Sequence, residues 1–400
     1  MKLQGDTYMR LKPIDARARS RVGRRRRLVR TALGLSAALA CTVAGAQNRA
    51  QQTVPAEQTA AAARERNWRP PRFSWGDPNL EGTFTSRDMQ GIPLERPEQF
   101  GTRQFLTPEE FQQRLSSGPG GFAAFVDQQA DSESRLELSA LDSTERGTRV
   151  FGYTSYVIEP ENGRVPAFTD EGQQRRARGG GGQANGPFYT TEDFSYYDRC
   201  ISRGVTGSIM PSLYGDAMRI IQSPTEVAIS YEMLHDTRVI PLDGRAQASP
   251  GVRQYMGSSV GRFEGDTLVV ETTNFTDELA VARMPHSEEL KLTERFTRID
   301  PDMIDYVVTI DDPRTYTAPW TIRLTLTTQP GYEVLEYSCH EGNNFIRTAL
   351  RAEQQYQQRA REALAKGEPI PERPRPRNTG GLGIFAPPSE TEAVDIGTIE

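Results

Sequence analysis

Histidine occurs at only three positions of the 400-residue chain, and two of the three are followed by an acidic residue. His235 precedes Asp236, and His340 precedes Glu341. An imidazole beside a carboxylate can pass protons near neutral pH, which suits an elimination, an isomerisation or a hydrolysis. We therefore predict Glu341 as a general acid or base, with further catalytic candidates at His235, Asp236 and His340.

Two glutamates occupy strand positions that alternate with apolar side chains. Glu294 alternates with Leu292 and Phe296, and Glu341 continues the more apolar face of a strand predicted over 332–340. Because alternate residues of a strand share a face, we expect both carboxyls to point inward. Burial raises the pKa of a carboxyl, which would let it transfer a proton. The alternative is an internal Glu–Arg ion pair, for example with Arg199, Arg295 or Arg298.

Arg199 and Arg203 follow an aromatic segment that contains Phe194, Tyr196 and Tyr197. Guanidinium groups orient carboxylates and carbonyls through paired hydrogen bonds. We predict that these arginines bind the substrate, and that the other substrate contacts are Glu294, Tyr337 and Asn343. The alternative is that this segment only closes one end of the fold.

Sequence signatures of several other chemistries are missing. The chain has no H-E-x-x-H pattern, no paired-cysteine zinc pattern and no G-x-S-x-G elbow. The glycine run 179–182 lacks the Lys-Ser/Thr that a phosphate-binding loop requires. We therefore expect no metal site and no other cofactor.

The first 46 residues resemble a signal peptide. A basic segment at 24–30 precedes an apolar run at 31–43, and Ala44 and Ala46 form an A-x-A cleavage site. We predict cleavage after Ala46 and a periplasmic or secreted protein, with general secretion favoured and a twin-arginine signal or a lipoprotein cysteine at Cys41 as alternatives. The apolar run is too short for a stable membrane span, so we expect none after cleavage.

Removing residues 1–46 takes away eleven Lys/Arg and two Asp/Glu, which changes the formal net charge from −5 to −14. An acidic protein is a poor partner for nucleic acid. We expect a small-molecule ligand or substrate instead. The two cysteines that remain, Cys200 and Cys339, are expected to form a disulfide in an oxidising compartment; two buried thiols are the alternative.

The chain after residue 46 divides by composition. We expect a flexible leader at 47–66, an irregular or helical part at 67–172 and a Gly/Arg-rich surface loop at 173–187. A β-rich core at 188–350 follows, then a solvated helix at 351–366 and a proline-rich tail at 367–400. Within the second part, helices are predicted over 107–115 and, less clearly patterned, over 122–146.

Short β-rich runs with turn residues between them fill the core segment. The predicted strands are 226–233, 238–242, 261–263, 267–275, 291–298, 304–310, 320–327 and 332–340. Their short connections favour a mainly β fold, an antiparallel meander that closes into a calycin-like barrel or a cupped sheet. An open β-sandwich is the alternative.

Several motifs together resemble a family of exported bacterial proteins that has no established activity. They are W-G-D-P-N-L-E-G-T-F from Trp75, D-R-C-x-x-R-G from Asp198, E-G-D-T-L-V-V-E-T-T-N-F from Glu264 and Y-x-C-H-E-G-N from Tyr337. The resemblance implies export and a shared β-rich fold, but no reaction.

These features lead to two expectations about function. The first is an exported enzyme that uses acid–base chemistry on a small polar or aromatic molecule held in the cavity of the sheet. The second is a periplasmic ligand-binding or carrier protein that uses the same cavity without chemistry.

Overall fold

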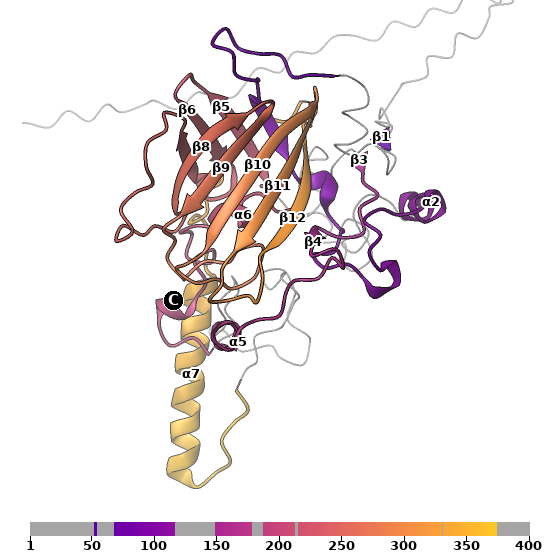
Figure 1. Ribbon diagram of the computed structural model, residues 1–400. Coiled ribbons are helices and arrows are strands. Elements are labelled where there is room, and N and C mark those ends of the chain that lie inside the picture. Colours follow the sequence, from indigo (N-terminus) through magenta and orange to yellow (C-terminus); the bar gives the residue numbers. More distant parts are fainter. Residues whose placement is uncertain are drawn as a thin grey trace, which may run out of the picture. The chain divides into compact units, whose positions relative to one another are not determined.

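The computed structural model describes residues 52–53, 68–116, 149–177, 187–212, 215–329 and 331–373. Within these residues, ten strands form one antiparallel sheet in the order β7-β6-β5-β2-β12-β11-β10-β9-β8, with β4 paired to β12 beside this path. A separate parallel pair joins β1 to β3. Figure 1 shows β8 to β12 side by side. The strands are β1 (Gln52–Thr53), β2 (Gly82–Thr85), β3 (Arg149–Val150), β4 (Val157–Glu159), β5 (Ala217–Gln222), β6 (Glu226–Tyr231), β7 (Thr237–Pro241), β8 (Ser258–Glu264), β9 (Thr267–Thr273), β10 (Lys291–Asp300), β11 (Met303–Asp311) and β12 (Trp320–Thr327).

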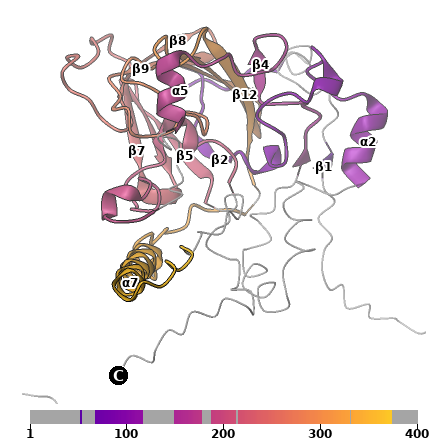
Figure 2. The same ribbon diagram turned by 90° about the horizontal axis from the view of Figure 1, so that it is seen from below.

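The mainly β, antiparallel fold predicted from the sequence is confirmed, as a cupped sheet rather than a closed barrel or an open sandwich. In the described residues no backbone ladder joins the edge strands β7 and β8. The two edges nevertheless approach each other, because a Cβ atom on Gly261 of β8 would lie 2.7 Å from Cγ2 of Ile240 in β7. Figure 2 shows the resulting curvature of the sheet.

Strand β2 connects two meanders that the sequence predicted as one. Strands β5 to β7 form the first meander and β8 to β12 the second, and β2 lies between β5 and β12. Its pairing with β12 is limited to Thr85 opposite Thr327. The prediction that residues 67–172 are irregular or helical is therefore wrong for β2 and β4, which belong to the main sheet.

The short β2–β12 contact is reinforced by a buried carboxylate. Asp88, which is 6% exposed, accepts hydrogen bonds from the Thr327 hydroxyl at 2.7 Å, from the Gln329 amide at 3.3 Å and from the Arg149 backbone N–H at 2.9 Å. These bonds satisfy a charge that would be costly to bury alone. They hold the N-terminal segment against β12.

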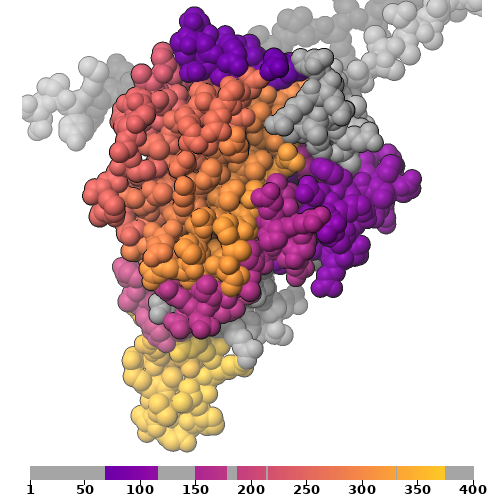
Figure 3. Space-filling view, in the orientation of Figure 1, coloured from indigo at the N-terminus to yellow at the C-terminus, as the bar shows by residue number. Residues whose placement is uncertain are grey.

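Residues 69–72 lie beside the turn between β8 and β9. Arg69 and Arg72 both pair with Asp266 in this turn. Figure 3 shows the N-terminal segment in indigo above the strands, which are coloured salmon to orange.

The alternation of the strands separates the core from the outer surface. In β6, Val227, Ile229 and Tyr231 are buried, whereas the residues between them are only partly buried. The same period-two pattern places large side chains inside the cup. The largest of these buried side chains include Trp320, Tyr306, Phe84 and Phe296.

The helices agree only in part with the sequence predictions. The one predicted over 107–115 is present as α2 (Pro108–Ser116), and the solvated helix at 351–366 starts earlier, as α7 (Phe345–Lys366). Part of the predicted loop 173–187 is the end of α5 (Asp170–Ala177). The short helix α6 covers Gly204–Gly207. The predicted signal peptide, most of the leader, the helix at 122–146, the glycine run 179–182 and most of the tail lie outside the described residues.

The strand predicted over 332–340 is wrong. We call residues 331–344 the strap. They lie between β12 and α7 and have no regular secondary structure. The reason is a tertiary contact: the buried carboxylate of Glu232 accepts hydrogen bonds from the Tyr332 hydroxyl and from the Leu335 backbone N–H. Side-chain bonds here replace the ladder that a strand would need.

Candidate functional site

Glu294 points into the cup, as its alternation with Leu292 and Phe296 predicts. It is fully buried, and its carboxylate accepts two hydrogen bonds from the Arg238 guanidinium, at 2.6 and 3.0 Å, and a third from the Tyr306 hydroxyl at 3.0 Å. Its partner is none of the arginines suggested from the sequence. Arg295 pairs with Glu264 on the outer face, and Arg298 donates to backbone carbonyls.

The carboxylate of Glu294 shifts the pKa values of its two partners. Burial lowers the pKa of Arg238, but the negative charge of Glu294 outweighs it and raises that pKa above its ordinary value. Burial and the same carboxylate raise the pKa of Tyr306. Because its oxygens already accept three hydrogen bonds, Glu294 stabilises the cup interior and is a poor candidate for substrate contact.

In the described part of the chain, no side-chain hydrogen bond or ion pair joins the predicted catalytic residues to one another. His235, His340 and Glu341 are exposed, and Asp236 is partly buried. The prediction that Glu341 points inward is wrong, because the chain leaves the sheet before the strap and strand alternation no longer applies. His235 lies after β6 in a 3₁₀ turn, over Met233–His235.

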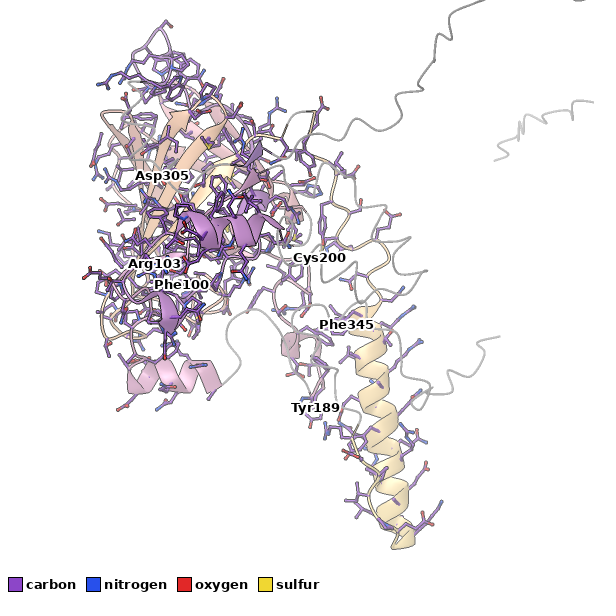
Figure 4. The ribbon with its side chains drawn as sticks, turned by 90° about the vertical axis from the view of Figure 1, so that its right-hand side faces the viewer. Phe100, Arg103, Tyr189, Cys200, Asp305 and Phe345 are labelled. Carbon is purple, nitrogen blue, oxygen red and sulfur yellow. A yellow bond between two sulfur atoms is a disulfide. The ribbon has the colours of Figure 1, made fainter. Side chains whose placement is uncertain are left out.

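A disulfide fixes the strap. Cys200 and Cys339 are bonded, with their Cα atoms 5.8 Å apart, which confirms the predicted pairing. Asn343 also donates a hydrogen bond from its side-chain amide to the Asp198 carbonyl at 3.0 Å. Figure 4 shows Cys200 near Phe345, the first residue of α7. The strap is therefore held at Glu232 and at the segment 198–200.

Arg203, Tyr197, Tyr337 and Arg283 form what we call the arginine–tyrosine cluster. The guanidinium of Arg203 lies 5.7 Å from the centre of the Tyr197 ring, and the Tyr197 and Tyr337 hydroxyls are 3.4 Å apart. Tyr337 comes from the strap, so the disulfide helps to position it. Arg203 and Tyr337 were predicted to bind the substrate, and the structure brings them together.

The cluster carries excess positive charge. Arg87 forms a buried ion pair with Asp216 at 3.1 Å, and Asp216 and Arg283 also lie within electrostatic range of Arg203. Burial lowers the pKa of Arg203. Tyr197 and Asp216 oppose this shift, whereas the neighbouring positive charge of Arg283 adds to it. Among the described residues, no carboxylate lies within 4.0 Å of either the Arg203 or the Arg283 guanidinium.

One donor of the cluster is unsatisfied. The Nη1 atom of Arg203 is buried and has no hydrogen-bond partner in the described part of the chain. Arg283 donates from Nη2 to the Pro211 carbonyl at 2.7 Å. A buried donor without a partner is costly, so such a group usually meets a water, an ion or a ligand.

Arg199 lies in a neighbouring aromatic group. Its guanidinium is 4.5 Å from the centre of the Tyr196 ring, and that ring contacts Tyr255. Burial and a hydrogen bond to Glu278 raise the pKa of Tyr196 to about 12. Arg199 is thus near the cluster but occupied by a cation–π contact of its own.

Asp236 interacts both with the cluster and with a side chain inside the cup. Its carboxylate accepts a hydrogen bond from the Ser202 hydroxyl at 2.7 Å and another from the Arg203 backbone N–H. Burial raises its pKa, although these hydrogen bonds oppose the shift. Burial inside the cup raises the pKa of Tyr231, and the negative charge of Asp236 adds to this shift.

A small cavity lies beside α6, with about 10 Å³ open to the centre of a water molecule. It has room for one water at most. Its lining includes Val205, Thr206, Tyr255, Phe275 and His286. This cavity is too small for an organic ligand, so we place the candidate site at the arginine–tyrosine cluster.

Comparisons with known proteins show no family. No protein-family model and no curated protein matches the chain, so the resemblance to exported bacterial proteins stays a prediction. A crystal structure of a mutant of the fluorescent protein UnaG is 14% identical; the match covers 32% of this chain and 83% of that one, with a TM-score of 0.18. At this TM-score the similarity gives no information about function.

In the described residues, no cluster of three or more His, Cys, Asp or Glu side chains could hold a metal ion. No helix in the same residues is both long and apolar enough to cross a membrane.

The sequence predicted half of the cluster. Arg203 and Tyr337 were predicted as substrate-binding residues, but Arg283 and the neighbouring pair Arg87 and Asp216 were missed. Arg283 and Asp216 lie in loops and Arg87 lies in a 3₁₀ turn, so no local pattern links the three. A left-handed backbone at Arg283, with φ of 65°, is visible only in the structure.

Proposed function

We propose that this protein is exported and binds a small molecule at the arginine–tyrosine cluster without changing it chemically. The buried Arg203 Nη1 supports this proposal most, because it is an unsatisfied charged donor beside two tyrosine rings. Ligand sites in proteins combine such a fixed polar group with aromatic walls. The disulfide would hold the two segments that carry Arg203 and Tyr337 in fixed positions before the ligand binds.

The geometry favours binding over acid–base catalysis. A proton-transfer mechanism needs its acid and base within hydrogen-bond reach of one substrate. Glu341, His340 and His235 are exposed, and no hydrogen bond joins them to one another or to Glu294 in the described residues. Asp236 alone is partly buried and close to the cluster.

The first prediction is that Arg203→Met weakens ligand binding by about 10- to 100-fold, since hydrogen bonds to charged groups contribute about 1.5–3 kcal/mol. Wild-type protein and variant are dialysed against a mixture of small polar and aromatic compounds, and retained compounds are identified by mass spectrometry. Arg359→Met, in an exposed position of α7, is the matched control and is expected to retain the same compounds as wild type.

Two results of this dialysis would count against the proposal. Equal retention by wild type and Arg203→Met would place the site elsewhere. Disappearance of a retained compound with appearance of a new mass would support catalysis instead of binding.

The second prediction concerns export. The intact mass of the protein purified from a bacterial periplasm is expected to correspond to a chain that begins at Gln47, because Ala44 and Ala46 fit the cleavage site. The disulfide is compatible with such a compartment. An uncleaved mass in the cytoplasmic fraction would contradict export.

A further inference from the structure

We infer that the ligand carries an anionic group, a carboxylate or a phosphate, on an aromatic body. This inference rests on the proposed function and names the chemistry of its ligand.

The cluster and its neighbours carry more positive than negative charge. Arg87 is paired with Asp216, and both Asp216 and Arg283 lie within electrostatic range of Arg203. The Arg87–Asp216 pair is internally balanced, with side chains 3% and 4% exposed. The charges of Arg203 and Arg283 remain without a carboxylate within 4.0 Å in the described residues. Two like charges in a partly desolvated place repel each other, and an anion between them would offset that repulsion.

The nearest other carboxyl does not supply this anion. Asp236 contacts Arg203 through the backbone N–H, not through the guanidinium. Its side chain accepts a hydrogen bond from the Ser202 hydroxyl at 2.7 Å, and no ion pair joins it to the Arg203 guanidinium in the described residues. The positive charge of the Arg203 guanidinium is therefore left for an external group.

The hydrogen-bond donors indicate an oxygen-rich anion. The Arg203 Nη1 is buried and has no partner in the described residues. A planar guanidinium matches the spacing of carboxylate and phosphate oxygens. Because burial strengthens a charge-assisted hydrogen bond, a neutral oxygen would satisfy this donor less well.

The rings indicate the rest of the ligand. Tyr197 and Tyr337 lie on the two segments that the disulfide joins, and their hydroxyls lie 3.4 Å apart. Tyr196 and Tyr255 form a second ring pair, with centres 5.1 Å apart. Aromatic side chains pack well against flat apolar groups. An aryl carboxylate or aryl phosphate combines the two features that this site offers.

The test is a calorimetric titration of the full chain with four probes: benzoate, phenyl phosphate, inorganic phosphate and benzamide. Benzoate or phenyl phosphate is expected to bind at least about tenfold more tightly than neutral benzamide, and more tightly than inorganic phosphate. The stronger of the two identifies the anionic group. Binding is expected to weaken with added salt, because screening reduces the charge attraction.

Variants of single residues show whether the probe binds at the cluster. Arg203→Met is expected to weaken binding of the stronger probe by about 10- to 100-fold, and Arg283→Met to weaken it about 5- to 50-fold and to reduce its salt dependence. Arg359→Met is expected to bind like wild type. Circular dichroism and melting temperature show whether each variant is folded; if Arg203→Met does not fold, Arg203→Lys and Arg283→Met carry the test.

The outcomes separate this inference from the proposed function. If benzamide binds as tightly as benzoate and Arg203→Met weakens both, the site is real but its ligand is not an anion. If inorganic phosphate binds as tightly as phenyl phosphate, the aromatic part of the inference is wrong. If no probe binds, or if Arg203→Met binds them all like wild type, the inference is wrong as a whole.

Discussion

Replacing Arg238 with methionine is expected to lower the free energy of unfolding by about 3–5 kcal/mol, because it leaves Glu294 as an unpaired charge in the core. Arg238 provides two of the three hydrogen bonds that Glu294 accepts, and both side chains are at most 4% exposed. The Tyr306 hydroxyl alone cannot replace a guanidinium charge. Urea denaturation followed by fluorescence measures the loss.

Two matched variants show that the effect comes from the broken pair. The double variant Arg238→Met/Glu294→Leu is expected to recover most of the lost stability, since apolar residues of similar size often substitute for a buried ion pair. Arg295→Met removes an arginine from an exposed pair with Glu264 and is expected to change stability by less than about 1 kcal/mol. An Arg238→Met protein as stable as wild type would show that Glu294 is not buried as an ion.

Removing the disulfide by Cys200→Ser/Cys339→Ser is expected to cost about 2–5 kcal/mol of stability. The two cysteines are 139 residues apart, and closing so long a loop strongly restricts the unfolded chain. The strap would then be held mainly by Glu232 and by the hydrogen bond of Asn343. Urea denaturation of wild type and of the double variant checks this value.

The same variant also tests the link between the disulfide and the site. Because Tyr337 lies on the strap two residues before Cys339, its position beside Tyr197 is expected to loosen and ligand binding to weaken. Dithiothreitol is expected to destabilise wild type and to leave the double serine variant unchanged. If reduction changes neither stability nor binding in wild type, the disulfide does not organise the strap.

Strand alternation predicted most of the sheet, and tertiary contacts decided the rest. The strands from β6 to β12 were found as short β-rich runs separated by turn residues, with the clearest alternation in β6. Strand β2 has only four residues, too few for a pattern, although it joins the two meanders. The segment 332–340 has an alternating pattern but is drawn into the strap by Glu232, whose position no local pattern reveals.

The buried Arg238–Glu294 ion pair could likewise be predicted only in part. The inward orientation of Glu294 follows from its neighbours Leu292 and Phe296, which belong to the same strand. Its partner Arg238 lies on β7, more than fifty residues away, and the register that brings the two together depends on how the sheet curls. A sequence can therefore give the face of a residue without giving its partner.

The candidate site was predicted where residues belong to compact motifs. Arg203, Cys200, Tyr337 and Cys339 lie in two short segments that the disulfide joins. The excess charge was not predicted, because Arg283 and Asp216 come from loops with no shared pattern. The exposure of Glu341 also required the structure, since it depends on where the chain leaves the sheet.

The most direct test of the account is a crystal structure of the protein grown with whichever of benzoate or phenyl phosphate binds more tightly. The bound molecule is expected between Arg203 and Arg283, with an anionic oxygen within hydrogen-bond distance of the Arg203 Nη1 and its ring against Tyr197 or Tyr337. A molecule bound inside the cup against Arg238 and Glu294, or at any place that Arg203 does not contact, would contradict it.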